Sequence, residues 1–332
     1  MSIKSFLPVI LMGAIVAAGC GDNKSASTTP GAQSSPNSGG LHIAVIPKGT
    51  THAYWKSVEQ GADQAGKEMG ATITFKGPLK EDDRAQQISI VQQFVSDKMD
   101  GIVIAPLDEE ALQRPAHDAM AQNIPVVVID SALKGVVGKD YDSFVATNNL
   151  KGGMLGGQRL GQILGGKGKV VMLRYEAGSA STMDRETGFL TAIQKFPGIT
   201  VISDNQEGGS TQSEAKTAAL NMVDVLKQAN GIFCPNESTT VGMLLALKQL
   251  NMVGKAKFVG FDTSDELIAA LKANQIDALV AQNPIKMGYL GVKTCIEAIK
   301  KLPYEKNIDT GVMVVDAKNI SSPEVVKLLG GG

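Results

Sequence analysis

The chain has 332 residues and a formal net charge of −1 at pH 7, with 20% charged and 43% hydrophobic residues. This balance argues against nucleic acid or an anionic membrane surface as the main partner. Its length beyond position 40 is enough for one large or two ordinary domains.

The first twenty residues have the order of a secretory signal. Lys4 is followed by an apolar run over 6–16 and then by Ala17-Ala18-Gly19-Cys20. The run is shorter than the roughly 20 apolar residues that cross a bilayer, so it indicates a cleaved signal over 1–19 rather than a transmembrane span. The small residues before Cys20 resemble the lipobox of bacterial lipoproteins. That resemblance implies that Cys20 is lipidated; the alternative is an ordinary signal in which Cys20 is incidental.

Residues 21–40 are almost wholly Gly, Ser, Thr, Pro, Ala, Asn and Gln. Such a composition buries too little apolar surface to offset the entropy of ordering. Together with Cys20 it predicts a flexible tether over 20–40, with acyl chains as the membrane anchor. The expected location is periplasmic or otherwise extracytoplasmic, lipid-anchored to a bacterial membrane.

Two cysteines remain after Cys20. Cys234 ends a strand-like run and Cys295 lies within a helical stretch, so buried thiols are favoured over a disulfide, which an oxidising compartment would allow. The three histidines, at positions 42, 52 and 117, are scattered, and no Cys/His cluster has metal-ligand spacing. We therefore expect neither a metal nor a cofactor.

Short apolar runs alternate with amphipathic stretches after position 40. The runs occur at 43–46, 73–75, 102–104, 126–129, 170–173, 201–202, 231–233, 258–261 and 278–280. They are typical of strands that are buried on both faces of a sheet. The amphipathic stretches include 55–69, 84–97 and 211–227. This alternation predicts an α/β protein with two doubly wound parallel sheets, one over 41–147 and one over 148–283.

Polar side chains recur where the predicted strands end, which is the edge at which open parallel sheets bind ligands. The first strand is followed by a segment that contains Lys48, His52, Tyr54 and Trp55, the only tryptophan. Later strand exits carry Asp130, Ser131, Arg174, Glu176, Asn236, Glu237, Asp262, Gln282 and Asn283.

From Leu41 to the C-terminus the chain resembles the type I periplasmic sugar-binding proteins of ABC importers, of the ribose-binding kind. The motifs that carry the resemblance are YWKSVEQGA at 54–62, DGIVIAP at 100–106, RETGF at 185–189, Asn236-Glu237, VGFD at 259–262 and AQ at 281–282. The resemblance lies in their order and spacing together.

The resemblance implies two lobes joined by a three-crossover hinge near 147–148, 283–284 and about 311. The lobes would then be discontinuous, with 41–147 plus 284–311 in one and 148–283 plus 312–332 in the other. It further implies a monomer that closes over a monosaccharide or a similar polyhydroxylated ligand and delivers it to an ABC importer permease. Hinge closure of this kind is known for periplasmic binding proteins.

The resemblance also implies a set of ligand-binding residues: His52, Tyr54, Trp55, Asp130, Ser131, Arg185, Asn236, Asp262 and Gln282. Tyr54 and Trp55 fall where the family has an aromatic pair that sandwiches the sugar ring. His52 stands where the ribose-binding pattern has Asn, and Ser131 stands where it has Arg. The second-half aromatic has no clear counterpart, because 207–210 falls there instead. These departures leave the individual sugar open.

The residue types fit such a ligand. Aromatic rings offer rigid apolar surface to the C–H faces of a sugar. Carboxylates accept hydroxyl protons, arginine donates in a fixed fork, and amides do both.

Each position also has a structural alternative. Trp55 could be an ordinary core residue. Asp130 and Asp262 stand directly after strands, where helix N-caps are common. Arg185 fits a solvated helix face, Asn236 and Gln282 fit turns, and His52 fits a surface loop. Lys48 and Glu176 lie near the expected cleft without matching a family ligand position.

Three other functions agree with parts of the sequence. A receptor for a sugar-like signalling molecule of the autoinducer-2 type shares the fold, and the segment 75–78 faintly resembles such receptors. A regulator of the lac-repressor kind shares the lobes, but residues 1–40 hold a signal and tether instead of a helix-turn-helix. A glycoside hydrolase would need two carboxylates across a cleft, and Asp130 and Asp262 are the candidates for that pair. We therefore expect a binding protein and no enzyme.

Overall fold

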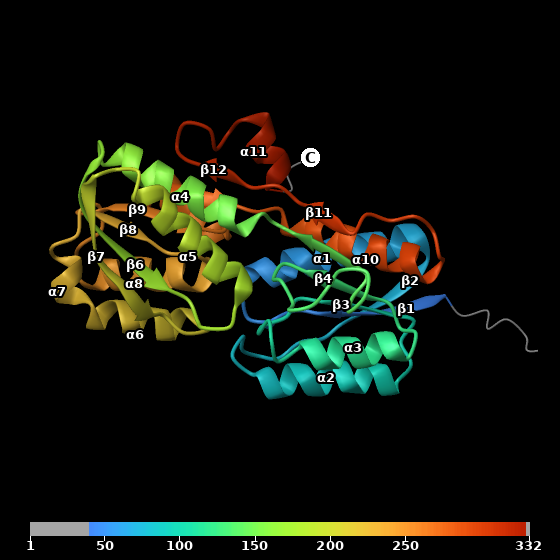
Figure 1. The fold of residues 1–332 in the computed structure, drawn as a ribbon. Helices are drawn as coiled ribbons and strands as arrows, with labels where there is room; N and C mark the ends of the chain where they lie inside the picture. The colour runs from blue at the N-terminus through green and yellow to red at the C-terminus, as the bar shows by residue number, and fades with distance from the viewer. Residues whose placement is uncertain (1–39, 330–332) are drawn as a thin grey trace, which may run out of the picture. The chain divides into compact units, whose positions relative to one another are not determined.

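The computed structural model describes residues 40–329. Within them, the first six-stranded sheet is entirely parallel, as Figure 1 allows the reader to follow. Its spatial order is β11 (Asn307–Asp309), β5 (Ser143–Ala146), β4 (Val126–Ile129), β3 (Gly101–Ile104), β1 (Leu41–Ile46) and β2 (Ala71–Phe75).

The second six-stranded sheet repeats the same relative strand order, which makes the two sheets topological duplicates. It runs β12 (Met313–Val315), β10 (Ala278–Ala281), β9 (Lys257–Phe261), β8 (Gly231–Phe233), β6 (Lys167–Arg174) and β7 (Gly198–Glu207). Only the edge strand β12 is antiparallel to its neighbour β10. The strands β5, β11 and β12 were not predicted; β5 begins with a polar residue and the other two span three residues each.

Helices connect the strands as the alternating pattern predicted. They are α1 (Ala53–Met69), α2 (Arg84–Ser96), α3 (Gln113–Ala121), α4 (Asn149–Ile163), α5 (Ala180–Ile193), α6 (Gln212–Asn221), α7 (Val223–Leu226), α8 (Glu237–Gln249), α9 (Asp265–Lys272), α10 (Pro284–Ile299) and α11 (Pro323–Leu328). The stretch 211–227 forms two helices, α6 and α7, that meet at Met222, and β7 is much longer than the predicted run at 201–202.

Alternate residues of the first sheet enter two different apolar layers. Ile43 and Val45 pack with α1 and α10, while Ala44 and Ile46 pack with α2 and α3. Figure 1 shows α1 and α10 side by side on one face of this sheet and α2 and α3 on the other. This two-sided burial explains why the strands read as unbroken apolar runs.

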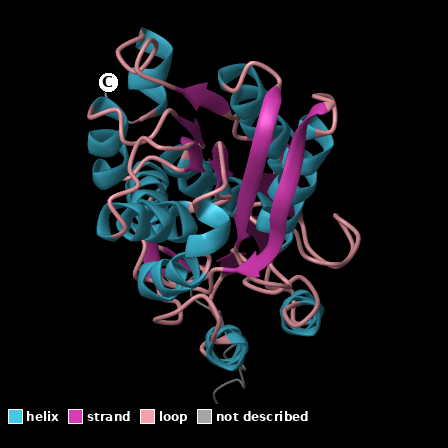
Figure 2. Cartoon of the chain, turned by 90° about the vertical axis from the view of Figure 1, so that its left-hand side faces the viewer, coloured by secondary structure: helices cyan, strands magenta, loops and turns pink. Residues whose placement is uncertain are grey.

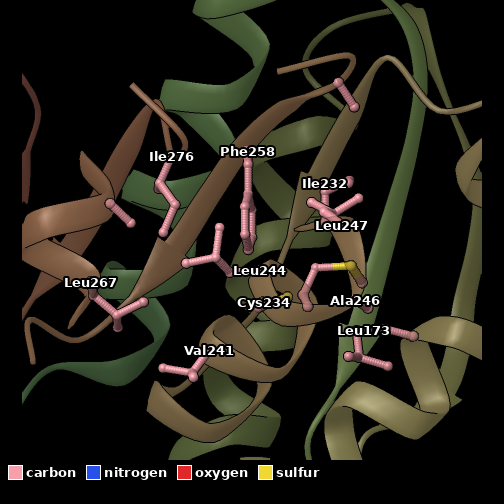
Figure 3. Packing of buried hydrophobic residues seen from close by; sticks show 14 of the residues in the cluster. Leu173, Ile232, Cys234, Val241, Leu244, Ala246, Leu247, Phe258, Leu267 and Ile276 are labelled. Carbon is pink, nitrogen blue, oxygen red and sulfur yellow. The ribbon is translucent and has the colours of Figure 1, made fainter. Parts of the chain in front are cut away.

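The second sheet is covered in the same way, as the layers of helices and strands in Figure 2 illustrate. Its apolar cluster beneath α6, α8 and α9 contains Cys234, and Figure 3 shows that side chain among Val241, Leu244 and Phe258. Cys295 lies in the α1–α10 layer of the first sheet. Both thiols are free and buried in separate clusters, which excludes a disulfide between them in this fold.

The chain passes between the two sheets three times: from β5 to α4, from β10 to α10, and from β11 to β12. Hydrogen bonds join these connections. The Thr147 hydroxyl donates to Gln282 Oε1 at 2.7 Å and lies 3.4 Å from the Thr310 hydroxyl. The predicted fold class, two doubly wound parallel-sheet lobes with three crossovers, is therefore confirmed.

Helices α4 and α5 lie unusually close because small residues line their contact. The Arg185 carbonyl occupies the place where a β-carbon on Gly153 would be, and the Leu150 carbonyl does the same for Gly188. Any larger residue at either position would push the helices apart. This contact fixes α5, which carries Arg185, against α4.

A search of residues 40–329 finds no helix that combines the length and the apolar character needed to cross a membrane.

Candidate functional site

Side chains from both sheets line one cavity at the carboxyl ends of the strands. Its walls are formed by Lys48, His52, Tyr54, Trp55, Glu81, Asp130, Tyr175, Ser181, Thr182, Arg185, Asn236, Glu237, Asp262 and Gln282. Of the predicted ligand-binding residues, all but Ser131 are in this set. The edge at which the sheets were expected to bind a ligand is thus the edge where the polar residues meet.

Asp130 and Asp262 occupy equivalent places in the two sheets, directly after β4 and β9. Both adopt left-handed backbone conformations, with φ of 64° and 72°. The Asp130 N–H donates to the Val145 carbonyl at 3.1 Å, and the Asp262 N–H donates to the Val280 carbonyl at 2.9 Å. The alternative that Asp262 is a helix N-cap is wrong, because Ser264 caps α9.

Asp130 is held by groups from its own half of the fold. Its Oδ1 accepts from the Tyr54 hydroxyl at 2.9 Å, and its Oδ2 lies 3.3 Å from Lys48 Nζ. Lys48 also donates to the hydroxyls of Ser179 and Ser181, which lie at the start of α5 in the other half. Lys48, left open by the sequence, is therefore a buried cation in the cavity wall.

Asp262 has a mixed set of donors. Its Oδ1 accepts from Gln282 Nε2 at 2.7 Å, and its Oδ2 accepts from the Glu237 backbone N–H at 2.8 Å. Burial raises the pKa of Asp262 to about 6, although the nearby Arg185 charge opposes that rise. Its carboxylate thus retains acceptor capacity at neutral pH, since each oxygen has two lone pairs.

Arg185 extends from α5 across the ring of Phe261, with its guanidinium carbon 4.0 Å from the ring centroid. Its Nε donates to Asn149 Oδ1 at 2.8 Å and its Nη1 donates to the Pro235 carbonyl at 3.0 Å. Its Nη2 is buried and has no hydrogen-bond partner among residues 40–329. Arg185 is only 2% exposed, so the solvated-helix alternative is wrong.

His52 and Glu81 form a buried ion pair, with Nδ1 and Oε1 2.7 Å apart. Burial alone would lower the pKa of His52, but the charge and hydrogen bond of Glu81 outweigh it and raise the pKa to about 9. Burial would likewise raise the pKa of Glu81, but His52 together with Lys48 and Trp55 lowers it to about 2. His52 is 4% exposed, so it is no surface-loop residue.

Glu81 also fixes two aromatic residues. It accepts from Trp55 Nε1 at 2.6 Å and from the Tyr175 hydroxyl at 2.7 Å. Trp55 has its ring body in the α1–α10 apolar layer and still lines the cavity, so the core and site interpretations both apply.

Tyr54 and Trp55 do not form the expected aromatic sandwich, in which a sugar ring would lie between their two rings. The Tyr54 and Trp55 rings meet edge to face with centroids 5.0 Å apart and an interplanar angle of 86°. No sugar ring fits between two rings that already touch. Tyr175, directly after β6 in the other half, brings a third aromatic ring to the cavity wall, in the half of the chain for which the sequence offered no clear aromatic counterpart.

Two predicted residues have structural duties. Ser131 does not line the cavity; its hydroxyl accepts from the Ser181 N–H at 3.1 Å. Asn236 lines the cavity but also caps α8, with its side chain accepting from the Thr239 N–H at 3.2 Å. The turn interpretation of Asn236 is therefore correct in part.

Four wall residues were not expected from the sequence: Glu81, Tyr175, Ser181 and Thr182. Tyr175 lies between the strand-exit residues Arg174 and Glu176, so the position between them would have identified it, whereas Glu237 was recognised at a strand exit but not included among the ligand-binding residues. Glu176, which was considered, is half-buried outside the wall, and burial together with Asp82 raises its pKa to about 7.

The cavity is therefore a polar pocket of paired charges and amides, with aromatic rings in its walls. Within residues 40–329, no group of three or more His, Cys, Asp or Glu side chains has a geometry that could hold a metal ion. The walls offer hydrogen-bond donors and acceptors on all sides, which suits a small, neutral, polar molecule.

Residues 43–303 match the periplasmic binding protein domain family. A D-allose-binding periplasmic protein of Escherichia coli is 26% identical over 271 residues, covering 79% of this chain and 87% of that protein. A ribose import binding protein of Bacillus subtilis is 26% identical over 272 residues, covering 81% and 84%.

Solved structures agree with these relatives. A carbohydrate transporter solute-binding protein from Agrobacterium radiobacter, in complex with D-arabinose, is 32% identical with a TM-score of 0.83, covering 87% of this chain and 98% of that one. A solute-binding protein of an ABC transporter from Agrobacterium vitis, with bound D-fucose, is 36% identical with a TM-score of 0.82, covering 86% and 98%. The chain therefore belongs to the periplasmic binding protein family and has its type I, two-lobed fold.

Proposed function

We propose that the protein is an extracytoplasmic solute-binding lipoprotein that captures a monosaccharide or similar polyhydroxylated ligand and delivers it to an ABC importer. The observation that carries the proposal is that Arg185 lines the cavity and that its buried Nη2 has no hydrogen-bond partner among the described residues. Leaving such a donor unpaired costs about 1–3 kcal/mol, so a hydroxyl oxygen placed there stabilises the complex.

The proposed ligand contacts involve the cavity-wall atoms that can still form a hydrogen bond in addition to those they already make. Asp130 and Asp262 accept hydrogen bonds from ligand hydroxyls on opposite sides. Arg185 and Asn236 donate hydrogen bonds to ligand oxygens. Trp55, Tyr54 and Tyr175 supply apolar surface for the C–H faces. Relatives with D-allose, ribose, D-arabinose and D-fucose in their names support this ligand class.

The proposed motion is hinge bending at the three crossovers. The lobes are then 41–147 with 284–311 and 148–283 with 312–332, in keeping with β11 pairing in the first sheet and β12 in the second. The backbone can rotate near Thr147, Asn283 and Gly311, and Gly311 has a φ of 92° that other residues rarely adopt. Closure brings the cavity walls together around the ligand.

The remaining parts of the proposal rest on the first forty residues. The signal at 1–19, the lipid-bearing Cys20 and the tether to residue 40 lie outside the described residues, apart from Gly40 itself. The proposed partners are the sugar, the importer permease and the membrane through the lipid anchor, with the protein acting as a monomer. The family consists of solute-binding proteins and not of enzymes.

A thermal-shift screen of pentoses, hexoses, polyols and autoinducer-2 tests the function. A sugar at a thousandfold excess over its Kd stabilises the folded protein by about 4 kcal/mol, which raises the Tm measurably. We expect one or a few related sugars to give this shift. A shift with autoinducer-2 alone would favour the signalling receptor. The absence of a shift with every compound would contradict the proposal. Turnover of a bound sugar would indicate an enzyme.

Asp262→Asn tests the acceptor role, because Asn tolerates the left-handed backbone at this position. Loss of the charged acceptor should weaken sugar binding by about ten- to a hundredfold. The affinity of the wild-type protein should fall as the pH drops below about 6, the pKa to which burial raises Asp262. Asp262→Asn should lack that fall in affinity.

Isothermal titration calorimetry at pH 5, 6 and 7.5 measures both effects. Asp265→Asn is the matched control, because this exposed carboxyl lies three residues further along, in the first turn of α9. Equal affinities for Asp262→Asn and the wild-type protein, or parallel pH profiles, would remove Asp262 from the site.

Cys20→Ser tests the anchor. Without a thiol to acylate, the protein should move from the membrane fraction to the soluble fraction when expressed in a bacterium, while keeping its affinity for sugar. Fractionation followed by immunoblotting measures this distribution. Retention of Cys20→Ser in the membrane fraction would contradict lipid attachment at that residue.

A further inference from the structure

The N-terminus of α1 lacks a cap from its own segment. His52 occupies the N-cap position, but its side chain makes no capping hydrogen bond, and the first turn of α1 contains no acidic residue. Instead, the His52 ring is turned toward Glu81 and the Ser210 carbonyl. The first backbone N–H groups of a helix need acceptors from elsewhere, and α1 carries Tyr54 and Trp55 in this turn.

Glu237 supplies those acceptors from the other half of the fold. Its Oε1 accepts from the Ala53 N–H at 3.1 Å and its Oε2 accepts from the Tyr54 N–H at 2.9 Å. Glu237 begins α8, which packs on the second sheet, whereas α1 packs on the first. One carboxylate therefore bridges the two halves through two charge-assisted hydrogen bonds.

The surroundings of Glu237 make this contact significant. Glu237 is only 3% exposed. No lysine, arginine or histidine in residues 40–329 forms an ion pair with its carboxylate. Its charge is balanced by the positive end of the α1 dipole, and by protonated His52, whose pKa Glu237 helps to raise. Its own backbone N–H donates to Asp262 Oδ2 at 2.8 Å, so the bridge adjoins a proposed ligand acceptor.

We propose that Glu237 is a positioning residue for ligand retention: by capping α1 across the cleft it favours the closed arrangement and orients the turn that carries Tyr54 and Trp55. The inference rests on the proposed function, since it concerns how that function holds its ligand. When the lobes separate, Glu237 returns to water and the two N–H groups of α1 lose their acceptor. The contact therefore acts on the closed form alone.

This role has a distinctive signature. Each carboxylate oxygen of Glu237 accepts a hydrogen bond from a backbone N–H group of α1, so the proposed role acts through the helix and requires no recognition of individual ligand hydroxyls. Its loss should weaken every ligand by a similar factor and should act mainly on dissociation, because opening precedes release. A residue that touched the ligand would instead change the ranking of epimeric sugars.

The test compares wild-type protein, Glu237→Gln and a control in stopped-flow and calorimetric measurements with the best sugar from the screen and two of its epimers. Glu237→Gln keeps the size of the side chain and removes its charge. We expect Kd and koff to rise about tenfold for all three sugars, with kon and the Tm of the ligand-free protein unchanged.

The control is Lys80→Gln. Lys80 pairs with Glu214 at 3.3 Å and also joins the two halves, but its side chain is 50% exposed and that of Glu214 is 42% exposed. An exposed pair of this kind contributes little, so Lys80→Gln should change Kd by less than about threefold. The contrast separates a buried helix cap from ordinary charge pairing across the cleft.

The outcomes are distinguishable. If the wild-type protein binds none of the sugars, the proposed function fails and the inference fails with it. If the wild-type protein binds and Glu237→Gln has the same Kd and koff, or loses affinity for one epimer only, the inference alone is overturned. Should Glu237→Gln fold poorly, Glu237→Asp, which keeps the charge but shortens the reach, must show the same uniform rise in koff for the proposal to stand.

Discussion

Two strand-end aspartates in left-handed conformations organise the site. A non-glycine residue with positive φ costs of order 1–3 kcal/mol and persists only where its surroundings fix it. Asp130 and Asp262 are fixed by backbone hydrogen bonds to the neighbouring strands β5 and β10. The turn brings each carboxylate to the wall of the shared cavity, where Tyr54 and Lys48 meet Asp130 and Gln282 meets Asp262. Duplication of the sheet thus places two carboxylate acceptors in the wall of one cavity.

The same side chains connect the cavity to the crossovers. Gln282 donates to Asp262 and accepts from Thr147, whose hydroxyl also lies near that of Thr310. These residues belong to the three connections between the sheets. In the proposed function, a ligand bound to Asp262 acts directly on the segments proposed to rotate, and the Glu237 cap adds a second link between that carboxylate and helix α1 of the other half.

Buried parallel strands made the fold predictable, because both faces of each sheet are covered and the strands become unbroken apolar runs. The strand-exit residues Asp130 and Gln282, and Arg185 on α5, were predictable from motif and position. Glu81 was not, because it lies in the polar segment 80–83, and only the fold brings it against His52, Trp55 and Tyr175. Glu237 was recognised at a strand exit and within a motif, but its capping of α1 was not predictable, since its partners are backbone groups of a helix 183 residues away. The aromatic sandwich failed because sequence neighbours contact each other.

Trp55 gives the most direct test that a sugar binds in this cavity. It is the only tryptophan in the chain, it lines the cavity wall, and its indole N–H donates to Glu81. Titration of the wild-type protein with a binding sugar should change the fluorescence of Trp55 saturably, with a midpoint equal to the calorimetric Kd. Calorimetric binding with no change in Trp55 emission at any sugar concentration would place the ligand elsewhere and contradict the account.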